Sequence, residues 1–222
     1  MAYFTKEFIE FFSNLEKNNN RDWFLQNKDR YIYSVKIPFE IFIEELISII
    51  RQQDDSILPS AKEAIFRIYR DVRFSADKSP YKTFTSAIIS AGGKKDYKVP
   101  GFYVEFNASR ISIYMGAYFL DSKQLYKVRT SIKNNLSEFN EIVNEQKFKR
   151  KFGKVLGEKN KIVQKEFREL ATIQPLIMNK QFYCNTQLDS KMIISSKLLE
   201  TIVEYYFIST PFKDFLIDAI NQ

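Results

Sequence analysis

The sequence predicts an α+β domain in which an antiparallel sheet of about four strands, within residues 65–117, packs against N- and C-terminal helices. Apolar residues recur with helical spacing over the first fifty residues and again after residue 120. Between residues 65 and 117 they alternate with polar residues instead. No linker or low-complexity tract divides the chain, so we expect residues 1–222 to form a single domain.

The N-terminal region predicts three helical segments. Thr5 is a suitable N-cap for the first helix, because an apolar stripe with helical spacing follows it between residues 8 and 15. Asn20 is expected to cap a second helix that extends to Pro38. A third apolar stripe runs over residues 39–50, and such a stripe indicates a helix face that packs in the core.

The middle of the chain changes to the two-residue period of β-strands. We expect strands at residues 65–74, 83–91, 101–107 and 111–115. The buried face of the first strand is expected to carry Phe66, Ile68, Val72 and Phe74. The short connections between the later strands favour an antiparallel meander with one face against the core.

The second half of the chain returns to helix. Asp121 and Gln124 have the spacing of a capping box, and an apolar stripe follows them. Ser137 is expected to cap the next helix. A helical stripe covers residues 198–206, and Pro211 is expected to open a separate last helix.

Two features of the composition restrict the chemistry. The sequence contains no histidine, so Ser-His-Asp and Cys-His mechanisms and zinc sites with imidazole ligands are excluded. Cys184 is the single cysteine and has no partner for an internal disulfide, which favours a reducing compartment. We expect no metal and no cofactor, and any catalysis must use Asp, Glu, Lys, Tyr, Arg or backbone groups.

Nothing in the sequence predicts a membrane segment. The longest run without a charged residue, at 83–93, is far shorter than the roughly 20 residues of a spanning helix. Lys6 and Glu7 interrupt the apolar stretch that a signal peptide needs. We therefore expect a cytoplasmic protein that does not enter the membrane, and the sequence does not indicate its oligomeric state.

Positive charge is concentrated in one segment. The formal net charge of the chain is +7. Residues 147–168 contain nine basic and two acidic residues, so this segment carries +7 and the rest of the chain sums to zero. Such a segment attracts nucleic acid or another anionic surface, or it forms a solvated lysine-rich helix and loop.

Residues 67–82 are the densest in functional side chains. The basic residues are Arg67, Arg70, Arg73, Lys78 and Lys82, and the acidic residues are Asp71 and Asp77. On a strand, Arg67, Asp71 and Arg73 share one face, where two guanidinium groups beside a carboxylate form an anion clamp. Arg70 would point to the apolar side. The excess of basic over acidic residues leaves room for an anionic ligand.

This pattern resembles the hallmark of a bacterial family, domain of unknown function 2461, which reads Arg-x-x-Arg-Asp-x-Arg-Phe, then Asp-Lys and a Tyr. The hallmark positions are filled by Arg67, Arg70, Asp71, Arg73, Phe74, Asp77, Lys78 and Tyr81. The family's N-terminal block is similar to residues 19–24, followed by Asn27, Lys28 and Tyr31. The resemblance extends from about residue 8 to residue 139, and it implies a shared fold and polar site but no assigned activity.

The first functional hypothesis is a domain, with or without enzymatic activity, that binds a phosphate or a carboxylate. The candidate ligand-binding residues are Arg67, Arg70, Asp71, Arg73, Lys78, Tyr81 and Lys82, with Asn20, Arg21, Trp23, Asn27 and Lys28. The residues between Asn20 and Lys28 are included because a helix beginning near Asn20 would direct its N-terminus at an anion. Asp71 and Tyr81 are the candidate proton-transfer groups.

Two other hypotheses stay open. In a structural or partner-binding domain, the Arg–Asp cluster is an internal ion network, and Arg73→Ala destabilises the protein by leaving Asp71 unpaired. In a nucleic-acid-binding protein, residues 147–168 follow the phosphates, and affinity falls steeply with salt. Charge reversal at Lys149, Arg150 and Lys151 would then weaken binding.

Overall fold

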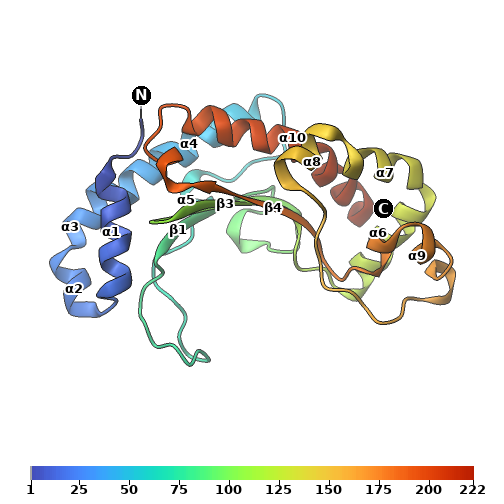
Figure 1. Cartoon of the computed structure of the whole chain (residues 1–222), viewed down its shortest axis with the longest axis horizontal. Coiled ribbons are helices and arrows are strands. Elements are labelled where there is room, and N and C mark those ends of the chain that lie inside the picture. The colour runs from blue at the N-terminus through green and yellow to red at the C-terminus, as the bar shows by residue number, and fades with distance from the viewer. Residues whose placement is uncertain (1) are drawn as a thin grey trace. The chain divides into compact units, whose positions relative to one another are not determined.

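The computed structural model describes residues 2–222 and confirms the α+β fold class. Within these residues, one antiparallel sheet has the strand order β1-β2-β3-β4 (Figure 1). The strands are β1 (Phe84–Ile89), β2 (Gly101–Asn107), β3 (Arg110–Ala117) and β4 (Phe182–Asp189). The first three match the strands predicted at 83–91, 101–107 and 111–115.

The chain divides into two compact units. Unit 1 contains the chain up to Lys95, Tyr103–Ile113 and Gln187–Val203. Unit 2 contains Asp96–Phe102, Tyr114–Thr186 and Glu204–Gln222. Strands β2, β3 and β4 each contribute residues to both units. The expectation of a single domain stays a prediction.

The first two helices of unit 1 begin where the capping residues predict. They are α1 (Lys6–Lys17), α2 (Arg21–Gln26), α3 (Lys28–Tyr31), α4 (Ile37–Arg51) and α5 (Ala61–Ala64), with a π-helical turn at Ile32–Lys36. The Thr5 side chain accepts a hydrogen bond from the Glu7 amide, and the Asn20 side chain accepts one from the Trp23 amide. The single helix predicted up to Pro38 is wrong, because α2 ends at Asn27, whose side chain donates to the Trp23 carbonyl at 2.9 Å.

An aromatic core joins these helices to the sheet within unit 1. The ring of Phe106, on β2, lies 5.9 Å from Phe4, 5.5 Å from Phe39 and 5.4 Å from Phe42, measured between centroids. All four side chains are almost completely buried. Burying each phenyl ring contributes roughly 1.5–3 kcal/mol, so this contact fixes one face of β2 against α4.

The strand predicted at 65–74 is wrong. This segment forms only isolated bridges, Ile65 with Ala87 and Tyr69 with Tyr81, and then a loop that extends away from β1 (Figure 1). The carboxylate of Asp71 accepts from the Arg73 amide, and such local turns compete with pairing between strands. The fourth strand is β4, which residues 65–117 do not contain.

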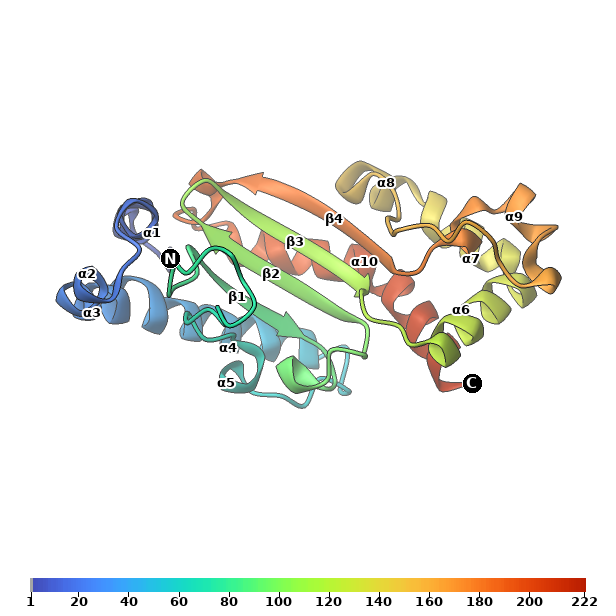
Figure 2. The same cartoon turned by 90° about the horizontal axis from the view of Figure 1, so that it is seen from below.

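The helices of unit 2 are α6 (Ser122–Asn134), α7 (Leu136–Asn144), α8 (Gln146–Phe152), α9 (Leu170–Ile173) and most of α10 (Leu198–Asn221). Figure 2 shows α6 and α7 beside the end of α10, where the rings of Phe139 and Phe215 lie 5.2 Å apart. Short 3₁₀ turns occur at Lys165–Phe167 and Pro175–Met178, as they do elsewhere at Gly93–Lys95 and Ser190–Met192.

Two predicted helix starts in this region are wrong. Ser137 is not a cap, because α7 begins at Leu136 and Asn135 is its N-cap residue. Pro211 does not open a separate helix and lies inside α10. The buried stripe of α10 continues unbroken past Pro211 to Ala219, and burial of the whole stripe outweighs the roughly 3 kcal/mol cost of an internal proline.

A buried arginine organises the return of the chain to β4 in unit 2. Arg129 is 2% exposed and donates to the carbonyls of Ile177 at 2.9 Å and Asn179 at 3.2 Å, and to the Gln164 amide oxygen at 3.0 Å. Its acceptors are neutral, and burial lowers the pKa of Arg129. Among residues 2–222, no helix is long and apolar enough to cross a membrane.

Candidate functional site

The arginine loop (residues 67–82) closes on itself through main-chain hydrogen bonds. The Arg70 amide donates to the Pro80 carbonyl at 2.9 Å, and the Lys82 amide donates to the Ile68 carbonyl at 2.8 Å. These bonds hold the two ends of the loop together in unit 1 and leave residues 71–79 as its tip. The loop is therefore anchored at its base although it is not a strand.

Both acidic side chains of the loop are used within it. Asp71 accepts two hydrogen bonds from the Arg73 guanidinium, at 3.0 and 2.6 Å, and Asp77 forms an ion pair with Arg70. The Lys78 ammonium donates to the Val72 carbonyl at 2.9 Å. Two of the three arginines of the loop, Arg70 and Arg73, are thus held in local ion pairs.

The predicted clamp of Arg67, Asp71 and Arg73 on one strand face is wrong in its geometry. Within residues 2–222, Asp71 pairs with Arg73 alone at contact distance, and Arg70, expected on the apolar side, pairs with Asp77. Phe74 was expected to be buried and is 97% exposed. The reason is the loop conformation, which removes the alternation that a strand would impose.

Asp71 and Tyr81, the candidate proton-transfer groups, are poorly suited to act as bases. Hydrogen bonds from the Arg73 side chain and amide lower the pKa of Asp71 to about 2, so its carboxylate is a weak proton acceptor. Burial raises the pKa of Tyr81, with a further increase from Tyr69 and an opposing effect of Arg21. At neutral pH, Asp71 is ionised and the Tyr81 hydroxyl keeps its proton.

The structure brings the two halves of the family pattern together at Tyr81. The Asn19 side chain forms two hydrogen bonds with the Tyr81 main chain: its NH₂ donates to the carbonyl at 2.9 Å, and its oxygen accepts from the amide at 3.1 Å. The Tyr81 ring stacks on Phe24 at 3.9 Å with an angle of 15°. The rings of Tyr31 and Tyr69 lie 5.3 and 6.4 Å from Phe24, so α2 and α3 form the base on which the loop rests.

The other N-terminal candidates have mainly structural contacts. Asn20 caps α2 and Asn27 ends it, as described above. Trp23 is half-buried, and its ring lies 5.7 Å from Phe11. Arg21 and Lys28 are exposed, and of these two the charge of Arg21 acts on Tyr81. With six residues, α2 is too short to provide the strong N-terminal dipole that the anion hypothesis used.

A different cluster forms where the base of the loop meets the sheet in unit 1. The Lys82 ammonium lies 5.2 Å from the Phe66 ring centroid and 5.6 Å from that of Phe84. Burial lowers the pKa of Lys82, and the nearby charge of Arg67 lowers it further, whereas the charge of Glu105 raises it. Within residues 2–222, neither Lys82 nor Arg67 has a carboxylate within ion-pair distance.

Glu105 supplies a half-buried carboxyl group beside Lys82. Its Oε2 accepts from the Tyr103 hydroxyl at 3.0 Å. Burial raises the pKa of Glu105, while the hydrogen bond from Tyr103 and the charges of Arg110 and Lys82 lower it. Sequence reasoning missed Glu105, although an acidic residue between Val104 and Phe106 in an alternating strand is the signal that could have found it.

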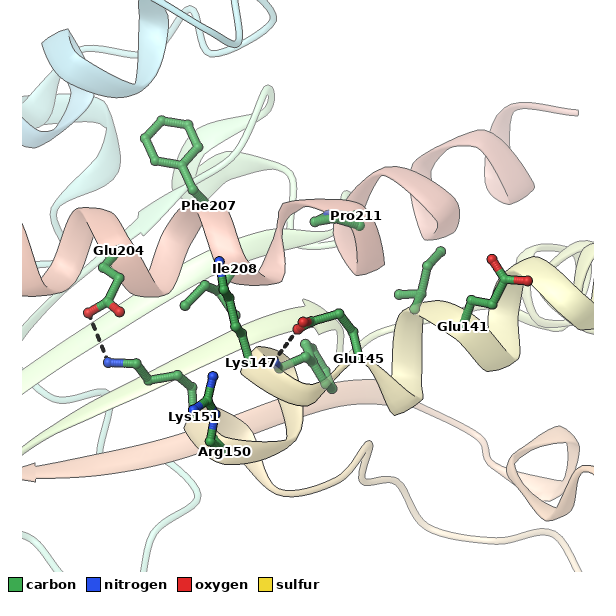
Figure 3. Close-up of a pocket in the computed structure, with 11 residues that line it drawn as sticks. Glu141, Glu145, Lys147, Arg150, Lys151, Glu204, Phe207, Ile208 and Pro211 are labelled. Atoms are coloured by element: carbon green, nitrogen blue, oxygen red, sulfur yellow. Dashed lines mark hydrogen bonds and ion pairs between the residues drawn. The ribbon is translucent and has the colours of Figure 1, made fainter.

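A groove of about 1060 Å³ in unit 2 does not involve the predicted site (Figure 3). Its charged rim has three carboxylates and three cations: Glu141, Glu145, Glu204, Lys147, Arg150 and Lys151. One pair, Lys151 and Glu204, is 2.8 Å apart. Because the rim is balanced in charge, the groove does not favour an anion. No group of three His, Cys, Asp or Glu suited to a metal ion occurs in the described part of the chain.

Comparison with known proteins identifies the family. No curated protein and no solved structure matches the chain. The model of the family described as "Conserved hypothetical protein (DUF2461)" matches residues 7–215, which extends the resemblance seen in the sequence towards the C-terminus. The chain belongs to the DUF2461 family of conserved hypothetical proteins.

Proposed function

We propose that this protein binds a small anionic ligand, a phosphate or a carboxylate, at Arg67 and Lys82. The observation that carries the proposal is the distribution of charge in the arginine loop. Its two carboxylates are paired with Arg70 and Arg73, so the remaining cations at its base, Arg67 and Lys82, face no acid at contact distance among the described residues. The proposed anion site therefore lies at the base of the arginine loop and not at its tip.

Electrostatics supports an anion at this place. Lys82 is half-buried between two phenyl rings, so its ammonium has lost part of its hydration. The positive charges of Arg67 and Lys82 repel each other. The carboxyl of Glu105 offsets this repulsion only in part, because burial disfavours its charged form. A phosphate or carboxylate bound between the two cations would relieve the repulsion and supply charge-assisted hydrogen bonds.

The test is a thermal-shift panel of phosphates, nucleotides and small carboxylates at matched ionic strength. A ligand present at 100 times its dissociation constant stabilises the folded state by about 2.7 kcal/mol. For a protein of this size, that corresponds to a rise in Tm of roughly 5–10 °C. Arg67→Ala is expected to abolish the shift while keeping the fold.

Lys62→Ala is the matched control for this experiment. Lys62 is an exposed lysine of unit 1 on α5, outside the arginine loop, and its removal is expected to leave the ligand-induced shift intact. A panel with no hit, or a hit that survives Arg67→Ala and Lys82→Met alike, would overturn the proposal.

Lys82→Met separates a binding role from a structural one. Methionine keeps most of the apolar stem against Phe66 and Phe84 and removes the cost of partly burying a charge, so we expect an unchanged or higher Tm without ligand. The folded-state pKa of Lys82 is lowered. Any gain in stability of Lys82→Met over wild type is therefore complete below that pKa and shrinks as pH rises through it. A lower Tm for Lys82→Met would indicate a structural role instead.

The alternative of an internal ion network makes a different prediction at Arg73. The Arg73 and Asp71 side chains are 77% and 47% exposed, so their pair lies in solvent and not in the interior. We expect Arg73→Ala to leave Tm unchanged, because exposed ion pairs contribute little to stability. A marked drop in Tm would revive the structural hypothesis.

Nucleic-acid binding is a second candidate function, which we propose for part of the basic segment, residues 147–168. The side chains of Lys154, Lys159 and Lys161 are exposed and make no ion pair within residues 2–222. Lys151, by contrast, pairs with Glu204 and lies 4.7 Å from the Tyr205 ring. Charge reversal at Lys159 and Lys161 is therefore a sharper test than the predicted triple change, and it should lower the salt dependence of polynucleotide binding.

A further inference from the structure

Five aromatic side chains of unit 2 form a continuous row, which we call the aromatic row: Tyr114, Tyr183, Tyr118, Phe119 and Tyr97. Successive ring centroids are 6.4, 5.4, 5.0 and 5.2 Å apart. Three of these rings are more than half exposed, namely Tyr97 at 58%, Tyr118 at 55% and Phe119 at 53%. A contiguous group of exposed rings is uncommon on a soluble protein and marks a binding surface.

The alternation of β3 and β4 explains why these rings meet. Tyr114 points to the opposite side of β3 from the buried Met115, and Tyr183 to the opposite side of β4 from the buried Phe182 and Cys184. Gly116 lies between Tyr114 and Tyr118, and a Cβ there would be 2.2 Å from the Phe182 carbonyl. The absence of a side chain at this position lets β3 and β4 approach beneath the rings.

A hollow of about 360 Å³ adjoins the exposed end of the row, and Tyr97, Tyr118 and Phe119 line it. Its lysines are already paired, Lys98 with Asp121 at 3.4 Å and Lys180 with Glu158 at 3.3 Å. The hollow is therefore nearly neutral and is lined by three aromatic rings, which suits an aromatic ring system better than a compact anion.

Lysines without an ion pair in the described part of the chain lie near the row, because part of the basic segment pairs with Tyr183 and with the residues that precede β4. The Leu156 amide donates to the Tyr183 carbonyl at 2.6 Å, and the Lys180 amide donates to the Glu158 carbonyl at 2.7 Å. Lys159 forms a β-bridge with Asn179. Residues 156–159 thus run beside Tyr183 and the residues that lead into β4, and Lys154, Lys159 and Lys161 are exposed along this stretch.

We propose that the aromatic row is a stacking platform for the bases of single-stranded nucleic acid, with Lys154, Lys159 and Lys161 contacting its phosphates. This inference deepens the second candidate function and rests on it. Rings that stack bases beside a basic track are the combination that sequence-tolerant single-strand binding uses. A duplex hides the faces of its bases, so the platform selects single strands over duplexes.

The experiment measures binding of a labelled oligothymidylate of about twelve nucleotides, and of the matching oligouridylate, by fluorescence anisotropy at several salt concentrations. Tyr118→Ala and Phe119→Ala should each weaken binding at least about five-fold, because stacking contributes about 1–3 kcal/mol per base. Tyr118→Phe, which keeps the ring, should bind like wild type. A strand carrying 5-iodouracil should crosslink to the row.

Controls separate this inference from the candidate function on which it rests. Tyr33→Ala removes a tyrosine of unit 1 that is 71% exposed and should change nothing. Charge reversal at Lys159 and Lys161 should lower the salt slope by roughly 1.4. If that change weakens binding but Tyr118→Ala and Phe119→Ala do not, the basic segment binds phosphates and the stacking platform is wrong. The inference is also overturned if neither oligonucleotide binds at low salt. The same holds if the protein binds the oligothymidylate and its duplex with oligoadenylate equally well.

Discussion

Gly116→Ala is expected to destabilise the protein by about 3 kcal/mol or more, which corresponds to a drop in Tm of roughly 6–12 °C. The added Cβ would lie 2.2 Å from the Phe182 carbonyl oxygen and 2.7 Å from the Tyr183 Cα, both of which are main-chain atoms that cannot rotate away. The residue also has a φ of 134°, which side-chain-bearing residues rarely adopt. Thermal unfolding followed by circular dichroism measures the loss.

Gly153→Ala is the matched control for this prediction. Gly153, at the end of α8, also has a positive φ, of 75°, but no atom lies within 4 Å of its added Cβ. Its ψ of −77° places it in a γ-turn conformation, so alanine should cost about 1–3 kcal/mol, the conformational penalty alone. Equal losses for the two variants would show that β3 and β4 do not approach closely at Gly116, and would also weaken the structural basis of the aromatic row.

Phe24→Ala is expected to cost about 3–5 kcal/mol and to release the arginine loop. Phe24 is 3% exposed, stacks on Tyr81 and contacts Tyr31, so its removal leaves a cavity beneath the loop. We expect a lower midpoint of urea denaturation and faster hydrogen exchange at the amides of Arg70 and Lys82, whose bonds close the base of the loop.

Leu25→Ala tests whether this effect is specific to the buried ring. Leu25 is the next residue of α2 and is 56% exposed, so its truncation should change the free energy of unfolding by less than about 0.5 kcal/mol. If Phe24→Ala behaved like Leu25→Ala, the arginine loop would not be docked on α2, and the role of the N-terminal block in positioning it would be wrong.

Local signals in the sequence identified much of the fold correctly. Thr5, Asn20 and Asp121 cap helices as predicted, since a capping side chain bonds to backbone amides only two or three residues away. The alternation in 101–107 located β2, because Phe102, Val104 and Phe106 face the core regardless of which strand pairs beside them. Such features depend on neighbours in the chain.

The errors occurred where a local turn competes with strand pairing, or where distant residues decide the structure. Residues 65–74 alternate like a strand, but the local pairs of Asp71 and Asp77 fold them into a loop, and β4 from the C-terminal half completes the sheet. Pro211 is a strong local stop signal, yet it lies within α10 because burial on both sides continues the helix. At Pro211 tertiary contacts outweigh the local preference, whereas at residues 65–74 a local turn competes with the strand pattern.

The sequence by itself determined the α+β class, the family and the segments rich in functional side chains, because composition, period and motif are properties of the linear chain. Only the tertiary structure decided which of those side chains are available. It placed Asp71 and Asp77 in local ion pairs, left Arg67 and Lys82 without a partner carboxylate among the described residues, and joined Phe24 to Tyr81 across more than fifty residues. The physical reason is that charge pairing and ring stacking act over a few ångströms in space, whatever the separation along the chain.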